Sequence, residues 1–365
     1  MKFPTATDAS NTTAQVLKQG EVQGSDVAAH SAGVLDIKTT ILPDADALFL
    51  TAIDRYGHEL WRWTFPVNKL NQANEVLSPL SNKVTSTETE NELTVKAKNH
   101  TFIFSKKDGQ LKGVSVNNRK ISFANGPRFI GARRADRSLD QFYNHDDEKA
   151  KEKDRTYSEF PDAAVFTKLD VKEDGGNLIV TADYKLGNLD KVQWTINPNG
   201  EAVLDYTYNF SGVVDLMGIC FDYPEDQVIS KRWLGAGPYR VWQNRIHGTQ
   251  YDVWENDYND PIPGETFTYP EFKGYFGSVS WMNIRTKEGT ISLTNETPDA
   301  YIGVYQPRDG RDRLLYTLPE SGISVLNVIP PVRNKVNSTD LCGPSSQPKW
   351  VNGPQSGRII FRFME

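Results

Sequence analysis

The chain has 365 residues, of which 38% are hydrophobic and 24% are charged, and its formal net charge is −6. This composition is typical of a globular protein with two or three domains. The negative balance argues against a nucleic-acid surface, which needs Lys and Arg clustered along one face. No run of the sequence approaches the ~20 apolar residues that cross a bilayer.

The N-terminal segment and the Cys and His residues argue against a secretory signal, a disulfide framework and a transition-metal site. The segment that follows Met1 lacks the apolar core of a secretory signal, so we expect a soluble chain whose compartment stays open. Cys220 and Cys342 have neither metal-site spacing nor the pattern of a disulfide framework. The five His residues form no HxH or HExxH pattern, so we expect no protein-bound transition metal and no cofactor.

Short alternating or β-branched runs, typical of strands, recur along the whole chain. They are residues 33–41, 48–57, 92–122, 178–186, 192–210, 289–296, 301–307, 323–330 and 358–363. The sequence KKDGQ, Lys106–Gln110, predicts a hairpin in which Gly109 takes a positive φ. Only Asp146–Arg155 favours a helix, and it has no apolar face, so an exposed helix and disorder are equally compatible with it. The sequence therefore predicts an all-β protein.

A polar stretch suggests a domain boundary. Asn74–Asn91 is rich in Ser, Thr, Asn and Glu and has no apolar periodicity, which is typical of a linker. We predict a small immunoglobulin-like sandwich over 1–75, incomplete at its start, and a linker over 76–90. The remaining residues, 91–365, predict too many strands for one small sandwich and suit a large one with two sheets.

The segment Trp233–Gly274 places aromatic rings and charged groups between turn-forming Gly and Pro residues. Sugars need both, because their C–H faces lie on aromatic rings while their hydroxyls require polar partners. For any single ring, burial in the core is the alternative. The rings belong to Trp233, Tyr239, Trp242, Tyr251, Trp254 and Tyr258. The polar partners are Arg240, Arg245, Glu255, Glu271 and Lys273.

The order of these segments resembles the C-terminal third of bacterial glycoside hydrolase family 2 β-galactosidases. The most specific match is WLGAGPYRVWQNR, Trp233–Arg245, against that family's W-x-G-x-G-P-x-E-x-Y-x-D-R pattern. Arg240, Trp242 and Asn244 depart from it. The resemblance implies an immunoglobulin-like domain followed by a supersandwich similar to galactose mutarotase. It also allows for a structural cation such as calcium or sodium, although no loop here specifies its ligands.

Two further features bear on the glycan. The family's P-x-E-N-G is replaced by YPEFKG, which keeps Glu271 and adds Lys273. Together with Arg240, this shift toward positive charge motivates the hypothesis that the glycan is acidic. Near the C-terminus, Trp350 stands where the family brings a tryptophan to the rim of its catalytic barrel, although packing beside Pro348 is an equal alternative.

The resemblance implies a function without catalysis by this chain. Family members carry their two catalytic carboxylates on a barrel with an Asn-Glu-Pro signature, which this sequence lacks. We expect a carbohydrate-binding and scaffolding part of such a hydrolase, with an oligo- or polysaccharide and the catalytic barrel as partners and a homo-oligomer allowed. The alternatives are a mutarotase or lyase on the supersandwich, with His247 and Glu271 as the acid and base candidates, and an oligomerisation module.

Overall fold

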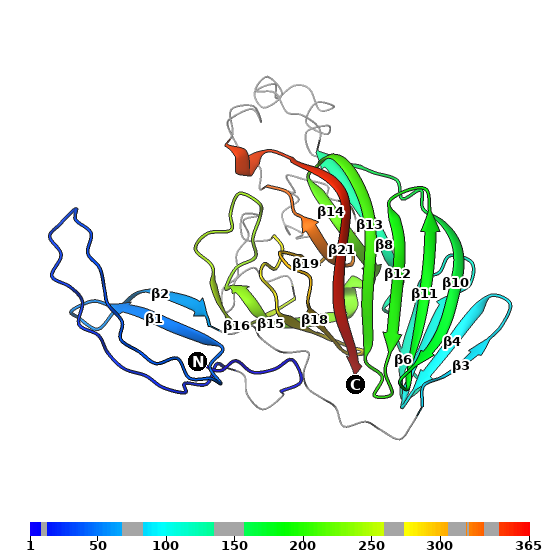
Figure 1. Cartoon of the computed structure of the whole chain (residues 1–365), viewed down its shortest axis with the longest axis horizontal. Helices are drawn as coiled ribbons and strands as arrows, with labels where there is room; N and C mark the ends of the chain where they lie inside the picture. Colours follow the sequence, from blue (N-terminus) through cyan, green and yellow to red (C-terminus); the bar gives the residue numbers. More distant parts are fainter. Residues whose placement is uncertain are drawn as a thin grey trace. The chain divides into compact units, whose positions relative to one another are not determined.

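The computed structural model describes residues 1–8, 13–67, 83–134, 157–258, 274–305, 319, 321–331 and 343–365 (Figure 1). The chain divides into two compact units, Met1–Gln72 and Ala73–Glu365. The regular elements of the described residues are strands and two 3-10 turns, η2 (Glu225–Gln227) and η5 (Pro344–Ser346). The all-β prediction is therefore confirmed. The candidate helix over 146–155 lies outside the described residues.

The first unit contains a β-hairpin. β1 (Ala47–Ile53) pairs antiparallel with β2 (Glu59–Pro66). The Asp54 carboxylate accepts hydrogen bonds from the backbone N–H groups of Tyr56 and His58, both at 2.8 Å, and these bonds hold the pKa of Asp54 below its usual value. An immunoglobulin-like domain needs two packed sheets. Because the described residues of this unit form one, the sandwich stays a prediction.

The segment 33–41 is not the strand that its β-branched residues predict. Its residues form no regular element, and all but one of them are exposed. β-branched side chains favour an extended backbone, but a strand also needs a hydrogen-bonded neighbour. Within the described residues, β1 and β2 pair only with each other.

The second unit is built on two large antiparallel sheets (Figure 1). In its described residues the first sheet has nine strands. In spatial order they are β10 (Val165–Asp174), β11 (Asn177–Lys185), β12 (Leu189–Ile196), β13 (Ala202–Val214), β21 (Lys349–Met364), β18 (Gly289–Asn295), β17 (Trp281–Thr286), β15 (Val228–Gly237) and β16 (Gln250–Asp257).

The second sheet has ten strands in the described residues. The main path is β19 (Tyr301–Val304), β20 (Ile323–Val328), β14 (Leu216–Asp222), β8 (Ala124–Arg134), β6 (Leu111–Val116), β5 (His100–Ser105), β4 (Glu92–Ala97) and β3 (Thr85–Glu88). β7 (Arg119–Ile121) pairs with β6, and β9 (Tyr157–Glu159) pairs with β8. β3 lies inside the segment predicted as a linker. Its residues are all exposed, so pairing with β4 creates this edge strand without any apolar pattern.

Aromatic rings join the two sheets into one sandwich. Phe221 of β14 lies 5.6 Å from Phe361 of β21 and 6.2 Å from Trp194 of β12, measured between ring centroids. Phe123 stacks on Phe221 at 4.6 Å and contacts Phe361 at 5.2 Å. All four rings are almost completely buried. The large two-sheet sandwich predicted for this part of the chain is confirmed.

The predicted hairpin between β5 and β6 is also confirmed. Phe102 pairs with Val114, and the connection contains Gly109 with φ +73°. A Cβ at Gly109 would lie 2.8 Å from Ala182 and from the Phe166 ring, so glycine is needed here both for its backbone conformation and for space.

Candidate functional site

The aromatic segment begins on β15, where two glycines allow close packing. A Cβ at Gly237 would lie 2.5 Å from the Trp254 indole, and one at Gly235 would lie 3.0 Å from the Gly277 carbonyl. Trp233 is fully buried, with its ring 4.8 Å from that of Phe276. Because Gly235 and Gly237 have no Cβ, the Gly277 carbonyl and the Trp254 indole can pack directly against the end of β15.

Trp254 lies on β16, opposite Trp233 in the register of the sheet. Its indole N–H donates to the carbonyls of Gly235, at 3.2 Å, and Gln250, at 3.3 Å. The ring is half-buried against the core. Trp254 thus ties the ends of two strands together, and its contact with a sugar stays a prediction.

Arg240 and Trp242 occupy the interior in this structure. Arg240 is 2% exposed, and its guanidinium carbon lies 5.7 Å from the Phe276 ring centroid. Trp242 is 1% exposed and packs edge-to-face on Tyr275 at 5.8 Å. An indole buried to this degree offers no ring face to a sugar. Both residues are core residues here, and the acidic-glycan hypothesis therefore loses the support of Arg240.

The chain reaches the surface at the turn that follows Trp242. The N–H of Arg245 donates to the carbonyl of Trp242 at 2.8 Å, and the Tyr239 hydroxyl donates to the carbonyl of His247 at 2.8 Å. Arg245, Ile246 and His247 are exposed. Burial raises the pKa of Tyr239, and the positive charge of Arg245 opposes that rise. Arg245 therefore lies close enough to Tyr239 to influence it.

The same turn holds the segment that precedes Trp350. The side-chain amide of Gln243 donates to the carbonyls of Ser345, at 2.9 Å, and Gln347, at 2.7 Å. The amide of Asn244 donates to the Ser346 hydroxyl at 3.1 Å. These bonds attach η5, which directly precedes β21, to the turn (Figure 1).

Trp350 is the second residue of β21, where it pairs with Val213 of β13. It is 71% exposed, more than any other Trp in the described residues. We group Trp350 with the exposed residues Arg245, Ile246 and His247 as the Trp350 surface, because the 242–245 turn is hydrogen-bonded to Ser345, Ser346 and Gln347, which lie three to five residues before Trp350. The sugar platform and the alternative of packing beside Pro348 at a sandwich edge both stay predictions.

Gln243 and Asn244 were not among the candidate site residues. The sequence did contain a signal for Asn244, because this residue occupies a position where the β-galactosidase pattern has Asp. That signal identifies a polar side chain but not its partner, because the partner lies about a hundred residues away in the sequence.

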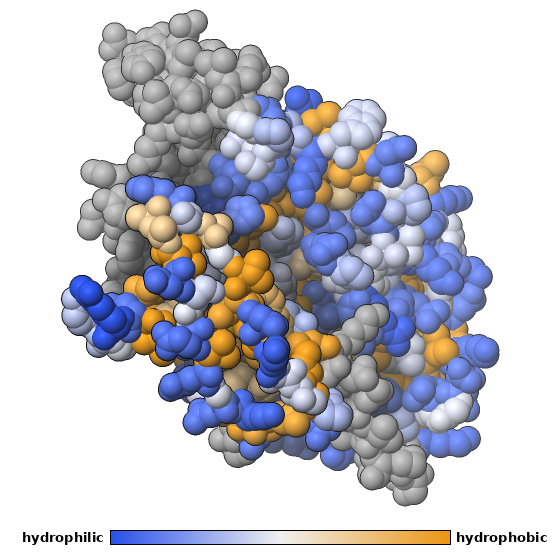
Figure 2. Space-filling model, turned by 60° about the vertical axis from the view of Figure 1, so that its left-hand side comes forward, coloured by the Kyte–Doolittle hydropathy of each residue, from blue (hydrophilic) through white to orange (hydrophobic). Residues whose placement is uncertain are grey.

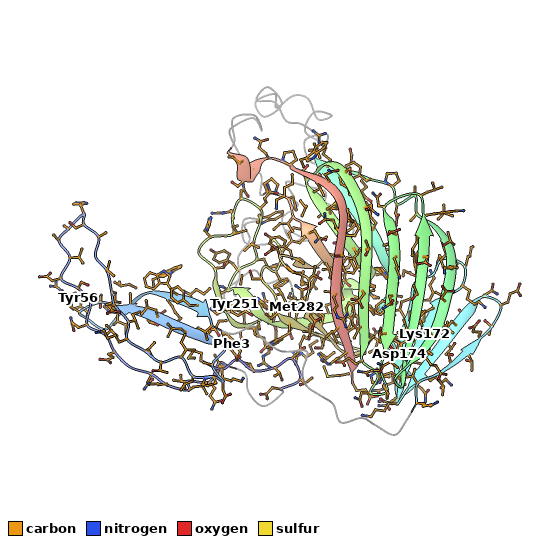
Figure 3. All side chains as sticks on the ribbon, in the orientation of Figure 1. Phe3, Tyr56, Lys172, Asp174, Tyr251 and Met282 are labelled. Atoms are coloured by element: carbon orange, nitrogen blue, oxygen red, sulfur yellow. The ribbon has the colours of Figure 1, made fainter. Side chains whose placement is uncertain are left out.

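The remaining candidates lie elsewhere. Glu271 and Lys273 fall outside the described residues, so the pairing of His247 with Glu271 stays untested. Tyr251, on β16, hydrogen-bonds Ser280 at 2.5 Å just before β17, the strand that carries Met282 (Figure 3). A search of the described residues finds no group of three His, Cys, Asp or Glu side chains arranged to hold a metal ion. In the same residues there is no helix with the length and hydropathy of a membrane span.

Solved structures with a similar fold include a galactose epimerase and an aldose epimerase homologue, both of low sequence identity. Galactose 1-epimerase from Lactobacillus acidophilus has a TM-score of 0.41 and 9% identity, covering 77% of this chain and 98% of that one. An aldose epimerase homologue from C. elegans has a TM-score of 0.35 and 8% identity, covering 77% and 99%. A comparison with curated proteins finds no match.

The sequence profile of one family matches the second unit. Its description is "Beta galactosidase small chain", and the match covers residues 96–329, from β4 to just beyond β20. It therefore includes the 242–245 turn, while η5 and Trp350 follow it. The match spans more than half of this chain, and the chain therefore belongs to the beta galactosidase small chain family.

Proposed function

We propose that this chain is the carbohydrate-binding and scaffolding part of a β-galactosidase-like glycoside hydrolase of family 2. In this proposal it lends the Trp350 surface to the rim of an active site whose acid and nucleophile belong to a catalytic barrel. The family supports the first half of the proposal. The second half rests on the geometry around Trp350.

The observation that carries the proposal is an exposed Trp on a fixed strand end. Three side-chain hydrogen bonds from Gln243 and Asn244 hold the residues just before Trp350, and the ladder to Val213 holds Trp350 itself. A backbone held in this way loses little conformational entropy when the ring that it carries binds. Its exposed face matches the C–H face of a pyranose.

The polar members of the Trp350 surface suit recognition more than catalysis. Arg245 supplies guanidinium N–H groups that donate hydrogen bonds to sugar oxygens, and His247 adds a ring nitrogen that forms hydrogen bonds. A retaining glycosidase needs two carboxylates about 5–5.5 Å apart. None of the four residues of the Trp350 surface is a carboxylate, so this surface can hold a sugar but cannot supply the acid and the nucleophile.

The experiment is a glycan titration of the full chain, combined with an activity assay. Binding of β-galactosides and β-glucuronides is measured by calorimetry for the wild type, for Trp350→Ala and for a control variant, Tyr56→Ala. Tyr56 is 68% exposed and belongs to the other unit, so the control removes a similarly exposed ring elsewhere. We expect Trp350→Ala to weaken binding about tenfold or more, because an apolar ring contact contributes ~1.5–3 kcal/mol.

Three outcomes would contradict the proposal. Equal affinity in Trp350→Ala and in the wild type would remove the Trp350 surface from recognition. Anomerisation of free aldoses by the chain alone, abolished in His247→Gln, would favour a mutarotase. If no glycan bound at all, a purely structural module would be the better account.

A further inference from the structure

One side of the β13–β21 pair faces away from the sandwich core. The two strands are neighbours in the middle of the nine-stranded sheet (Figure 1). On β21, every second residue from Trp350 to Arg358 is exposed, and the residues between them are partly buried. On β13, Tyr206 and Tyr208 are buried, so the residues that alternate with them point outward. The outward residues of the two strands therefore form one continuous surface.

These outward residues face each other across the two strands in a fixed register. Those that carry a ring, an amide or a hydroxyl are what we call the β13–β21 strip: Trp350, the pairs Ser211–Asn352 and Thr207–Ser356, and Asn209. From 207 to 213 on β13 and from 350 to 356 on β21, no outward position is charged. The Ser211 hydroxyl donates to Oδ1 of Asn352 at 2.9 Å, so both side chains lie on the same side of the sheet. This bond leaves the NH₂ group of Asn352 as a donor.

Charged residues begin where the strip ends. The next pair along the strands is Asp205 with Arg358. Nη1 of Arg358 lies 3.0 and 3.1 Å from the two carboxylate oxygens of Asp205, and its Nε lies 3.1 Å from the Glu296 carboxylate. These three groups satisfy one another. Lys191 of β12, which lies opposite Thr207 in the register, adds a positive charge beside this same end, far from Trp350 along the strand.

An exposed indole next to uncharged amides and hydroxyls matches the chemistry of a neutral sugar chain. A pyranose offers a C–H face that packs on an aromatic ring and hydroxyls that both donate and accept hydrogen bonds. Amide and hydroxyl side chains also donate and accept, whereas Arg and Lys are the usual partners of carboxylate and sulfate. In Figure 2, hydrophobic residues in orange reach the viewed face among hydrophilic ones in blue, so an exposed apolar side chain does not by itself mark a site. The combination of Trp350 with aligned polar pairs is more specific.

We propose that the β13–β21 strip binds an extended, neutral oligosaccharide that begins on Trp350 and runs along the two strands. This inference rests on the proposed function, because it takes the Trp350 ring as the first sugar platform, and it adds the class and the direction of the glycan. From Trp350 to Ser356 the strand covers about 20 Å, at ~3.3 Å per residue. That length suits several consecutive sugar units. The strip itself carries no positive charge to pair with a uronate or a sulfate.

The test is the dependence of affinity on the length of the glycan. Binding of galactose and of a neutral β-galacto-tetraose is measured by calorimetry on the full chain. We expect the tetraose to bind about tenfold or more tightly, because its further units reach the strip, where a hydrogen bond contributes a factor of about two to ten. In Asn352→Ala, the affinity for the tetraose should fall about three- to tenfold and that for galactose should stay unchanged. The control is Asn91→Ala, which removes an exposed amide between β3 and β4.

The two ligands separate this inference from the proposed function and from misfolding. A misfolded Asn352→Ala would lose affinity for galactose as well as for the tetraose. Equal affinities of the wild type for galactose and the tetraose, with weaker binding in Trp350→Ala, would overturn the strip and leave the Trp350 surface in place. Tighter binding of an oligouronide of the same length would overturn the neutral class of glycan. If Trp350→Ala bound both ligands as tightly as the wild type, the proposed function and the inference would fail together.

Discussion

Replacing Gln243 with Ala tests whether the 242–245 turn positions the segment before Trp350. The substitution removes two hydrogen bonds, from the side-chain amide to the carbonyls of Ser345 and Gln347, at 2.9 and 2.7 Å. It leaves the backbone bond from the Gln243 N–H to the Pro330 carbonyl, at 3.0 Å, in place. The turn itself should therefore persist, while the η5 segment loses two of its three side-chain bonds to the turn and keeps the one from Asn244 to Ser346.

The magnitude follows from those two bonds. A neutral hydrogen bond contributes about 0.5–1.5 kcal/mol net, so η5 should lose about 2 kcal/mol of local stability. The amides of Ser346 and Gln347, which donate within the 3-10 turn to Gly343 and Pro344, report on that opening. Their hydrogen exchange should accelerate about thirtyfold, since 1.4 kcal/mol corresponds to a factor of ten.

The assay is hydrogen exchange followed by mass spectrometry, read together with the glycan titration. The control is Asn188→Ala, which removes one exposed side-chain hydrogen bond, to the carbonyl of Asn209, far from η5 in the sequence. Protection that is unchanged at residues 343–348 in Gln243→Ala would refute the positioning role. So would faster exchange spread evenly over the sandwich, because that pattern reports a global loss of stability.

Three further predictions concern the sandwich. Gly237→Ala should cost about 1–3 kcal/mol and lower Tm by several degrees, because its Cβ would overlap the Trp254 ring, whereas Gly113→Ala, with no atom within 4 Å, should not. Trp242→Ala should reduce the free energy of unfolding by about 3–5 kcal/mol through a core cavity, measured by urea titration; a loss of glycan affinity without a loss of stability would contradict it. Burial raises the pKa of Cys220 to about 11 from 9.0, so its thiol stays neutral in the folded state while the unfolded thiol ionises; stability should fall above about pH 9, and less so in Cys220→Ala.

The sequence by itself determined the fold class and most of the strands of the second unit. Period-two patterns such as that of β11 record which side chains face a sandwich core, and this information is local. The hairpin at Lys106–Gln110 was predictable for the same reason, because an Asp-Gly pair has its own turn preference. Segment 33–41 was a wrong prediction, and β3 was missed, because pairing with a neighbour makes a strand and a single segment does not specify its neighbour.

The tertiary structure alone decided which residues of the aromatic segment are accessible. Arg240, Trp242 and Arg245 lie within six residues of one another, and sequence reasoning treated them as one binding set. Two of them face the core and one reaches the surface, because the bridge from Val241 to Tyr275 draws the chain inward just before it turns. Burial depends on neighbours distant in the sequence, so composition within the segment could not separate them.

The same reason explains the Trp350 surface. The sequence identified Trp350 through its place near the C-terminus, but its support comes from Gln243 and Asn244, about a hundred residues earlier. The two bonds from Gln243 end on backbone carbonyls, which every residue offers, and the bond from Asn244 ends on a hydroxyl, which any Ser or Thr offers. These acceptors therefore have no sequence signature, and only the folded sandwich, which brings η5 to the 242–245 turn, identifies them.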